Sequence, residues 1–239
     1  SIRINNAGLI MIEKGRMRLI RRHRERPELE KDQKVVLNPF DYKGKWQEVF
    51  EKAQPIHLEL GCGRGQFISE CAAANQNINY VAIDLYDEML VKTLRKINEK
   101  ELNNVRIIPM NISKLGEVFA DNEIDKIYIN FCNPWPSRRH HHRRLTHPEF
   151  LKVYKRLLKN HSEIWFKTDD DGLFKDSLRY FAGEGFDTKY LTYDLHQSDF
   201  SENIKTEYEE KFSSQGIKIK FGIFVVNKLA EEEDKEICL

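Results

Sequence analysis

One stretch decides the fold of this 239-residue chain: Ile56-His57-Leu58-Glu59-Leu60-Gly61-Cys62-Gly63-Arg64-Gly65-Gln66-Phe67. An apolar run breaks into three alternating glycines and restarts with the pattern of a helix. Glycine adopts backbone angles that other residues resist, and it lets a ligand approach bare peptide groups. Such a turn suits a nucleoside lying across the end of a strand. We therefore expect the rest of a sheet to be built outward from this strand.

The glycine spacing separates two kinds of nucleotide site. Glycines 61, 63 and 65 read Gly-x-Gly-x-Gly, whereas the dinucleotide fingerprint is Gly-x-Gly-x-x-Gly. A cofactor without phosphates needs only close approach and an acceptor for its amino group, which Glu59 can supply. The next apolar segment, 80–83, ends in Asp84, where ribose hydroxyls are usually held. Together these residues resemble the first motif and ribose acid of the Rossmann-like methyltransferases, which implies S-adenosyl-L-methionine as cofactor.

Charge is unevenly distributed along the chain. The net charge is only +1, yet residues 1–27 carry eight Arg or Lys, and residues 231–236 carry five acids against one lysine. We expect a basic arm and linker over 1–44, a catalytic domain over 45–230 and an acidic tail over 231–239. The six arginines of 16–26 either clamp RNA backbone or form an ordinary solvated segment. A polyanionic partner is therefore compatible with the near-neutral total.

Cysteine usage and hydropathy indicate a cytoplasmic protein. Cysteines 62, 71, 132 and 238 form no Cys-x-x-Cys pair, so we expect reduced thiols and no zinc site. No apolar run approaches the roughly 20 residues that span a bilayer, so no membrane partner is expected. The chain starts without methionine and has Met11 and Met17 soon after. We expect its first dozen or so residues to be a leader or a remnant of cloning.

Apolar periodicity predicts an α/β fold. Strands are expected at 56–60, 80–83, 105–110, 124–131, 163–168, 186–193 and 217–228. Helices are expected at 45–52, 66–74, 84–97, 147–158, 173–182 and from Thr206, and 27–40 is expected to be a linker. A capping box at Thr146 and Glu149, with Pro148 in the first turn, should open the fourth helix. The alternation predicts a seven-stranded, mostly parallel Rossmann-like sheet with helices on both faces and a final antiparallel strand pair.

Polar loops follow the fourth and fifth strands. Ligands of open α/β sheets sit at the carboxyl ends of strands, so the loop 132–136 should face the reactive end of the cofactor. The next eight residues, 137–144, hold four arginines and three histidines, which suits phosphate contacts. Adjacent histidines do not face one point, so no metal is expected there. In the acidic run 169–171, alternation points at most two acids toward one site, which favours Asp169 as a single functional acid.

These loops carry a resemblance to a known family. The segment Asn133-Pro134-Trp135-Pro136, the Arg/His run and Arg143-Arg144-Leu145-Thr146 resemble the bacterial tRNA (guanine-N7)-methyltransferases, whose motif is Asp-Pro-Trp-Pro-Lys with a basic stretch. Further matches are Phe166-Lys167-Thr168-Asp169 with Leu173-Phe174, and Thr206-Glu207-Tyr208-Glu209, which is similar to the family's Thr-x-Tyr-Glu. The likeness extends from about residue 56 to the last strand. Asn133 replaces the family's Asp, and Ser137 replaces its Lys.

The resemblance implies an activity and a set of site residues. The implied activity is methylation of N7 of the guanosine at nucleotide 46, in the variable loop of tRNA. Asn133 is the implied catalytic residue, and the cofactor residues are Glu59, Gly61, Gly63, Gly65, Asp84, Asn111 and Asn133. The substrate residues are Ser137, Arg138, Arg139, His140, His141, His142, Arg143, Arg144, Asp169, Thr206, Tyr208 and Glu209. Asp169 or Glu209 can present a carboxylate to the N1–H and N2 amino donors of guanine. Because guanine N7 carries a lone pair and no proton, in-line attack needs no general base.

Other functions remain open at this stage. Asn133-Pro134-Trp135 comes close to the Asn-Pro-Pro-aromatic loop of exocyclic-amine methyltransferases. A nicotinamide-dependent oxidoreductase is disfavoured by the glycine spacing, and a non-catalytic RNA-binding module with a degenerate pocket is suggested by the Asn133 replacement. Trp135 either packs between its prolines or stacks on a base, and Asn111 either borders the adenine ring or caps a turn. The sequence does not distinguish a monomer from a homodimer.

Overall fold

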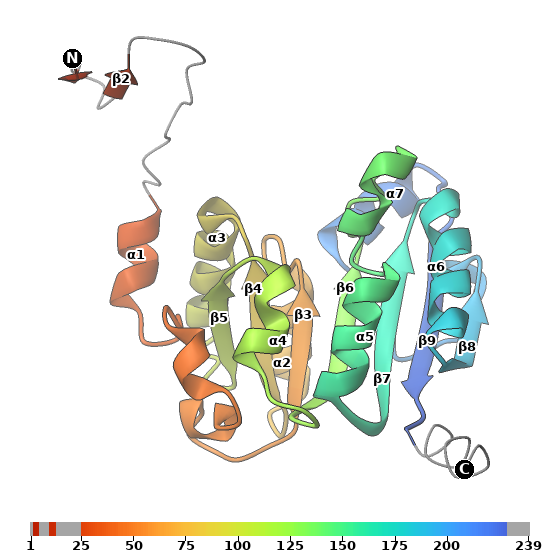
Figure 1. Cartoon of the computed structure of the whole chain (residues 1–239), viewed down its shortest axis with the longest axis horizontal. Helices are drawn as coiled ribbons and strands as arrows, with labels where there is room; N and C mark the ends of the chain where they lie inside the picture. Colours follow the sequence, from red (N-terminus) through yellow and green to blue (C-terminus); the bar gives the residue numbers. More distant parts are fainter. Residues whose placement is uncertain (1, 5–9, 13–24, 229–239) are drawn as a thin grey trace, which may run out of the picture.

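The structure is a computed structural model that describes residues 2–4, 10–12 and 25–228 (Figure 1). Strand β1 (Ile2–Ile4) pairs antiparallel with β2 (Ile10–Ile12). The arginine-rich segment 16–24, Met17 and the acidic tail lie outside the described residues, so the predictions made for them stay predictions. Among the described residues, no helix has the length and apolar character needed to cross a bilayer.

The main sheet has seven strands in the order β5-β4-β3-β6-β7-β9-β8. The strands are β3 (Ile56–Leu60), β4 (Asn79–Asp84), β5 (Val105–Pro109), β6 (Ile124–Asn130), β7 (Leu158–Thr168), β8 (Phe186–Thr192) and β9 (Lys220–Val226). β3 to β7 run parallel, and β9 lies antiparallel between β7 and β8. The predicted mostly parallel sheet with a final antiparallel pair is confirmed. Strand order reverses between β3 and β6, which is where ligands of such sheets bind.

Helices cover both faces of this sheet, as predicted. Because side chains alternate along a strand, each strand feeds two separate cores. One core packs β3, β6 and β7 against α4 (Leu115–Val118), α5 (Pro148–Leu157) and α6 (Asp171–Gly183), the face turned to the viewer in Figure 1. The other core packs the opposite face against α2 (Gln66–Ala74) and α3 (Asp87–Glu99). Helix α7 (Glu207–Ser214) follows the loop after β8 and borders the carboxyl-terminal edge of the sheet.

The predicted linker 27–40 is wrong, because this stretch packs on the domain. Helix α1 (Arg26–Lys31) buries Leu29 completely, and the Arg26 guanidinium lies 3.0 Å from the Asp87 carboxylate of α3. The backbone N–H of Val36 donates to the carbonyl of Ile107 in β5 (2.8 Å). These contacts join residues far apart in the sequence, so local periodicity gave no sign of them.

Several element boundaries also differ from the predictions. The helix expected over 45–52 is only a 3₁₀ turn, whose Trp46 is buried and donates from Nε1 to the Val118 carbonyl (2.9 Å). The α5 N-cap is His147, not Thr146, because the Thr146 hydroxyl bonds the Ser177 hydroxyl instead (2.7 Å). β7 begins before the predicted residue 163, and β9 begins after residue 217. The 3₁₀ helices are η1 (Pro39–Tyr42), η2 (Trp46–Val49), η3 (Ile112–Lys114), η4 (Arg138–Arg143) and η5 (Leu195–Gln197).

Candidate active site

A cavity of about 860 Å³ lies at the carboxyl ends of β3 to β6, with the start of α7 on one side. All the residues assigned to the cofactor by the sequence line it: Glu59, Gly61, Gly63, Gly65, Asp84, Asn111 and Asn133. Of the residues assigned to the substrate, His142, Arg143, Thr206 and Tyr208 line it. The structure therefore brings together segments that are more than 140 residues apart along the chain.

The glycine turn after β3 is fixed by sterics. All three glycines have positive φ angles, +77° at Gly61, +54° at Gly63 and +74° at Gly65, a region that favours glycine. A Cβ at Gly65 would lie 2.6 Å from the Thr93 side chain of α3, whereas Gly61 and Gly63 face open space within 4 Å. The Thr93 hydroxyl donates to the Gly63 carbonyl (3.0 Å). The turn is thus held against α3 on one side and left bare on the other.

Glu59 and Asn130 form a buried polar pair beneath this turn. Nδ2 of Asn130 donates to Oε1 of Glu59 (3.1 Å), and both side chains line the cavity. Glu59 Oε2 and Asn130 Oδ1 have no hydrogen-bond partner among the described residues. Burial raises the pKa of Glu59 to about 8, although the Asn130 bond and the Lys167 charge oppose the shift. Buried acceptors without a donor are costly, so the pair is suited to receive a cationic donor from a ligand.

The sequence patterns did not indicate a role for Asn130. It is the last residue of β6, just before the loop 132–136. A polar side chain ending an otherwise apolar strand at the carboxyl edge of the sheet was the available signal.

Asp84 and Asn111 hold turns at the ends of the next two strands. Asp84 accepts from the backbone N–H of Gly63 (3.0 Å) through Oδ2 and from that of Tyr86 (3.0 Å) through Oδ1. A carboxylate offers about four acceptor sites, so capacity for ligand hydroxyls remains. Oδ1 of Asn111 accepts from Ser113 N–H (2.9 Å) as the N-cap of η3, while the exposed side chain also lines the cavity. The two alternatives considered for Asn111 are therefore compatible.

The loop after β6 carries backbone strain at two aromatic residues. Phe131 has φ +51° and Trp135 has φ +42°, angles that bulky residues rarely adopt and that cost about 1–3 kcal/mol each. Oδ1 of Asn133, between them, accepts from Trp135 N–H (3.0 Å). Such strain persists only where surrounding contacts over-determine the backbone. Asn133 therefore shapes this loop as well as facing the cavity.

Arg144 departs from its expected role as a phosphate contact. Its side chain is buried, Nε donates to the Pro134 carbonyl (2.7 Å), and Nη1 forms an ion pair with Asp176 of α6 (2.7 Å). A guanidinium engaged in this way braces the strained loop against α6. The sequence did not predict this role for Arg144, because only the fold decides which arginine of the run is buried.

The other arginines of the basic run and His142 are exposed, His140 and His141 are half-buried, and the run lies around Trp135. The Arg143 guanidinium lies over the Trp135 ring (5.0 Å to the centroid), and the His140 ring lies 5.8 Å from it. Trp135 therefore contacts the basic run and also lines the cavity, and stacking on a base stays a prediction. Ser137, Arg138 and Arg139 are exposed beside it. The three histidines have different neighbours: His140 accepts from Arg139, His141 lies 3.4 Å from the Pro136 carbonyl, and His142 lines the cavity.

The acids after β7 divide into two structural residues and one candidate. Oδ1 of Asp170 accepts from Leu173 N–H (2.6 Å) as the N-cap of α6, and Asp171 forms an ion pair with Lys220 (2.7 Å). Asp169 is half-buried at the carboxyl end of β7, near the Cys132 thiol. Burial raises the pKa of that thiol to about 12, and the Asp169 charge acts in the same direction as a smaller cause. It does not line the cavity. Of the three acids, Asp170 and Asp171 have side-chain contacts within the domain, and the role predicted for Asp169 stays a prediction.

Glu209 also departs from its expected role. Its buried carboxylate lies 3.1 Å from Nζ of Lys167 in β7, accepts from Asn203 and lies 3.0 Å from Nε2 of His196. Burial lowers the pKa of Lys167, and the Glu209 charge opposes that shift. The carboxylate points away from the cavity and anchors α7 to the sheet. Tyr208, one residue earlier, is 55% exposed and stacks on Phe131.

Comparisons with known proteins identify the class. A family described as "Putative methyltransferase" matches residues 53–221. An antibiotic-related methyltransferase superposes with TM-score 0.58 at 20% identity, covering 80% of this chain and 94% of its own. The 16S rRNA methyltransferase KamB gives 0.58 at 11% identity, covering 77% and 93%. The chain is a methyltransferase of the Rossmann-like fold.

Relatives with higher identity define the family. The tRNA (guanine-N(7)-)-methyltransferase of Desulfitobacterium hafniense (strain DSM 10664 / DCB-2) is 74% identical over 212 residues, which is 89% of this chain and all of the relative. The protein of the same name from Clostridium tetani (strain Massachusetts / E88) is 60% identical, covering 87% and 98%. The chain belongs to the tRNA (guanine-N(7)-)-methyltransferase family, and the resemblance found in the sequence is confirmed.

Proposed function

We propose that the chain transfers a methyl group from S-adenosyl-L-methionine to N7 of a guanosine in tRNA. The observation that carries the proposal is the Glu59–Asn130 pair, whose unpaired buried oxygens lie beneath a bare glycine turn. The same cavity opens beside an exposed arginine-rich loop. The names of the relatives support the same substrate and the same atom.

The residues present fit the methyl donor. Glu59 and Asn130 offer acceptors to its ammonium group, and Asp84 offers them to ribose hydroxyls. The open space over Gly61 and Gly63 allows close approach to the backbone. Asn111 and Asn133 border the cavity beyond these groups. When bound, S-adenosyl-L-methionine supplies a methyl group made electrophilic by a sulfonium.

The reaction requires alignment of the base with the methyl group, and no proton has to be removed. Guanine N7 has a free lone pair and no proton even inside a base pair, so no side chain has to act as a base. The work of the protein is to hold the base in line with the methyl group and to stabilise charge that moves toward the base. Asn133 is the side chain that we assign to this position. Its oxygen is an acceptor, but it lacks the charge of the family's aspartate.

The RNA side of the cavity combines charge and aromatic surface. Arg138, Arg139 and Arg143 are exposed on and around η4, where they can neutralise phosphates. Trp135 and Tyr208 present rings on which an unstacked base can rest. Asp169 is our candidate acceptor for the N1–H and N2 donors of guanine. On the basis of the family resemblance, we propose nucleotide 46 of the variable loop as the target.

A single assay tests the proposal. Unmodified tRNA is incubated with the protein and the methyl-labelled donor, and chemical cleavage at 7-methylguanosine then maps the product. We expect cleavage at nucleotide 46. If mass spectrometry located the label on an exocyclic amine, the protein would instead be an exocyclic-amine methyltransferase. If no label rose above background, the result would support a non-catalytic RNA-binding module.

A further inference from the structure

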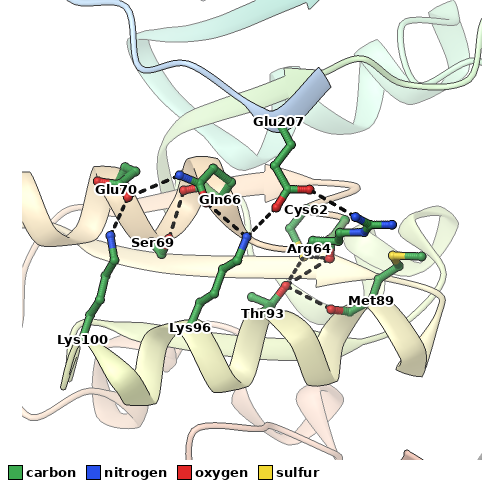
Figure 2. A network of polar contacts seen from close by, with 11 residues as sticks. Cys62, Arg64, Gln66, Ser69, Glu70, Met89, Thr93, Lys96, Lys100 and Glu207 are labelled. Carbon is green, nitrogen blue, oxygen red and sulfur yellow. Dashed lines mark hydrogen bonds and ion pairs between the residues drawn. The ribbon is translucent and has the colours of Figure 1, made fainter. Parts of the chain in front are cut away.

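The start of α7 is joined to the cofactor side of the cavity by one carboxylate. Oε1 of Glu207 lies 2.6 Å from Nζ of Lys96 in α3, and Oε2 lies 3.7 Å from Nη1 of Arg64 in the glycine turn (Figure 2). The same Lys96 ammonium donates to Oε1 of Gln66 at the start of α2 (3.1 Å). Helix α7, helix α3 and the glycine turn, which are distant in the sequence, therefore meet at Glu207.

This contact lies opposite the buried anchor of the same helix. Glu209 fixes α7 to β7, whereas Glu207 points toward the glycine turn and, like Tyr208, lines the cavity. Thr206 fixes the backbone at the start of this helix, because its hydroxyl accepts from Glu209 N–H (2.9 Å). With both contacts made, the helix is held from two sides and Tyr208 has a fixed place at the cavity wall. In the Thr-x-Tyr-Glu pattern, Glu207 occupies the position that the pattern leaves open.

Charge gives a second reason for an acid at this position. Arg64 is a half-exposed cation in the cavity lining, and Lys96 pairs with the same Glu207 carboxylate. The ligand that we propose carries positive charge on its sulfonium and its ammonium. Two uncompensated cations beside the cavity would disfavour such a ligand, and the single charge of Glu207 offsets one of the two positive charges.

We propose that Glu207 is a positioning residue that clasps α7 to α3 and the glycine turn. The clasp retains the cofactor and holds Tyr208 where the tRNA base must arrive. The identity of the cofactor in this statement rests on the proposed function, whereas the clasp itself does not. Exposed ion pairs contribute about 0.2–1 kcal/mol, so the expected effects are up to about fivefold.

Hydrogen exchange of the free protein tests the clasp without any ligand. We expect Glu207→Gln to raise amide exchange across residues 207–214, by up to about fivefold, with little change in the core strands. Glu210→Gln is the matched control, because Glu210 is an exposed acid on the same helix. Equal exchange in the wild type and Glu207→Gln would overturn the proposal.

Dissociation of S-adenosylhomocysteine, followed by stopped-flow fluorescence, tests retention. We expect Glu207→Gln and Lys96→Gln each to speed dissociation severalfold, and the double variant to be no faster than either one. Additive effects, or unchanged rates, would show that the two residues do not act as a clasp. Failure of the wild type to bind this ligand would instead overturn the proposed function and the retention role, and hydrogen exchange would still decide whether Glu207 holds α7.

Discussion

The two halves of the cavity are built by different means. On the cofactor side, Glu59, Asp84 and the glycine turn sit on buried strand ends, and backbone N–H groups or a buried amide hold them. On the RNA side, the wall consists of an irregular loop and the start of α7, which are held by arginine and carboxylate contacts. The first half is positioned by the buried backbone of the sheet, whereas the second depends on a few side-chain contacts. Substitutions in the two halves of the cavity should therefore impair the protein in different ways.

The largest expected effect comes from the buried anchor of α7. Glu209→Gln leaves the Lys167 ammonium in a buried site without its counter-charge, which typically costs about 3–5 kcal/mol of unfolding free energy. Urea unfolding measures this loss, and Glu210→Gln, on the exposed side of the helix, should change stability by less than about 0.5 kcal/mol. If Glu209→Gln left the unfolding free energy unchanged but abolished tRNA methylation, the result would instead support a direct contact between Glu209 and guanine.

On the cofactor side, the expected loss is in affinity. Glu59→Gln removes the charge that pairs with the ligand's ammonium, and charge-assisted hydrogen bonds contribute about 1.5–3 kcal/mol, or about ten- to a hundredfold in dissociation constant. Calorimetry with S-adenosylhomocysteine measures it. Glu70→Gln, which replaces a half-exposed acid of α2 that lies outside the cavity lining, is the control. Wild-type affinity in Glu59→Gln would contradict the role given to this carboxyl.

The same carboxyl makes cofactor binding depend on pH. Because the pKa of Glu59 is raised to about 8, the free protein holds a proton there at neutral pH and must release it when the cation binds. Affinity should therefore rise with pH between about 6 and 8, by up to about tenfold per unit, and level off above 8. In the ligand-free protein, the raised pKa favours folding below the ordinary value of 4.5, and this contribution is lost as pH rises toward 8. Proton release measured calorimetrically in two buffers should disappear in Glu59→Gln.

A moderate gain is expected at the boundary between the two halves. Asn133→Asp keeps the acceptor for Trp135 N–H and adds a charge facing the cavity. Two charges 4 Å apart interact by up to about 4 kcal/mol at an effective dielectric near 20, and solvent at this exposed side chain reduces that value. We expect single-turnover methylation to be faster by up to about tenfold. A rate that is unchanged or lower would contradict the role of charge at this position.

The smallest effect is expected at the exposed arginines. Each phosphate contact contributes about 0.7–0.9 to the slope of log affinity against log salt, so Arg139→Ala should lower the slope for tRNA by about one. Cofactor affinity should stay the same, because Arg139 lies outside the cavity lining. Filter binding at several salt concentrations measures the slope. If the slope for Arg139→Ala equalled that of the wild type, Arg139 would not be one of the residues that contact RNA phosphates.

The sequence by itself determined the cofactor half. The strand segments, the glycine turn, Glu59 and Asp84 follow from local patterns, and they lie together because the carboxyl ends of parallel strands meet at one edge. Glycine spacing and apolar periodicity are properties of a few neighbouring residues, so they can be read without the fold. The family resemblance added the substrate class through the Asn133 loop and the basic run.

Only the tertiary structure decided which polar side chains turn inward. Nothing in the local sequence distinguishes Arg144, which is buried against Asp176, from exposed Arg143, or buried Glu209 from the half-exposed Glu207 two residues earlier. The pairing of Asn130 with Glu59 likewise joins two strands that are neighbours only in the sheet. Burial and pairing depend on what distant segments bring to the same place, and that information exists only once the chain has folded.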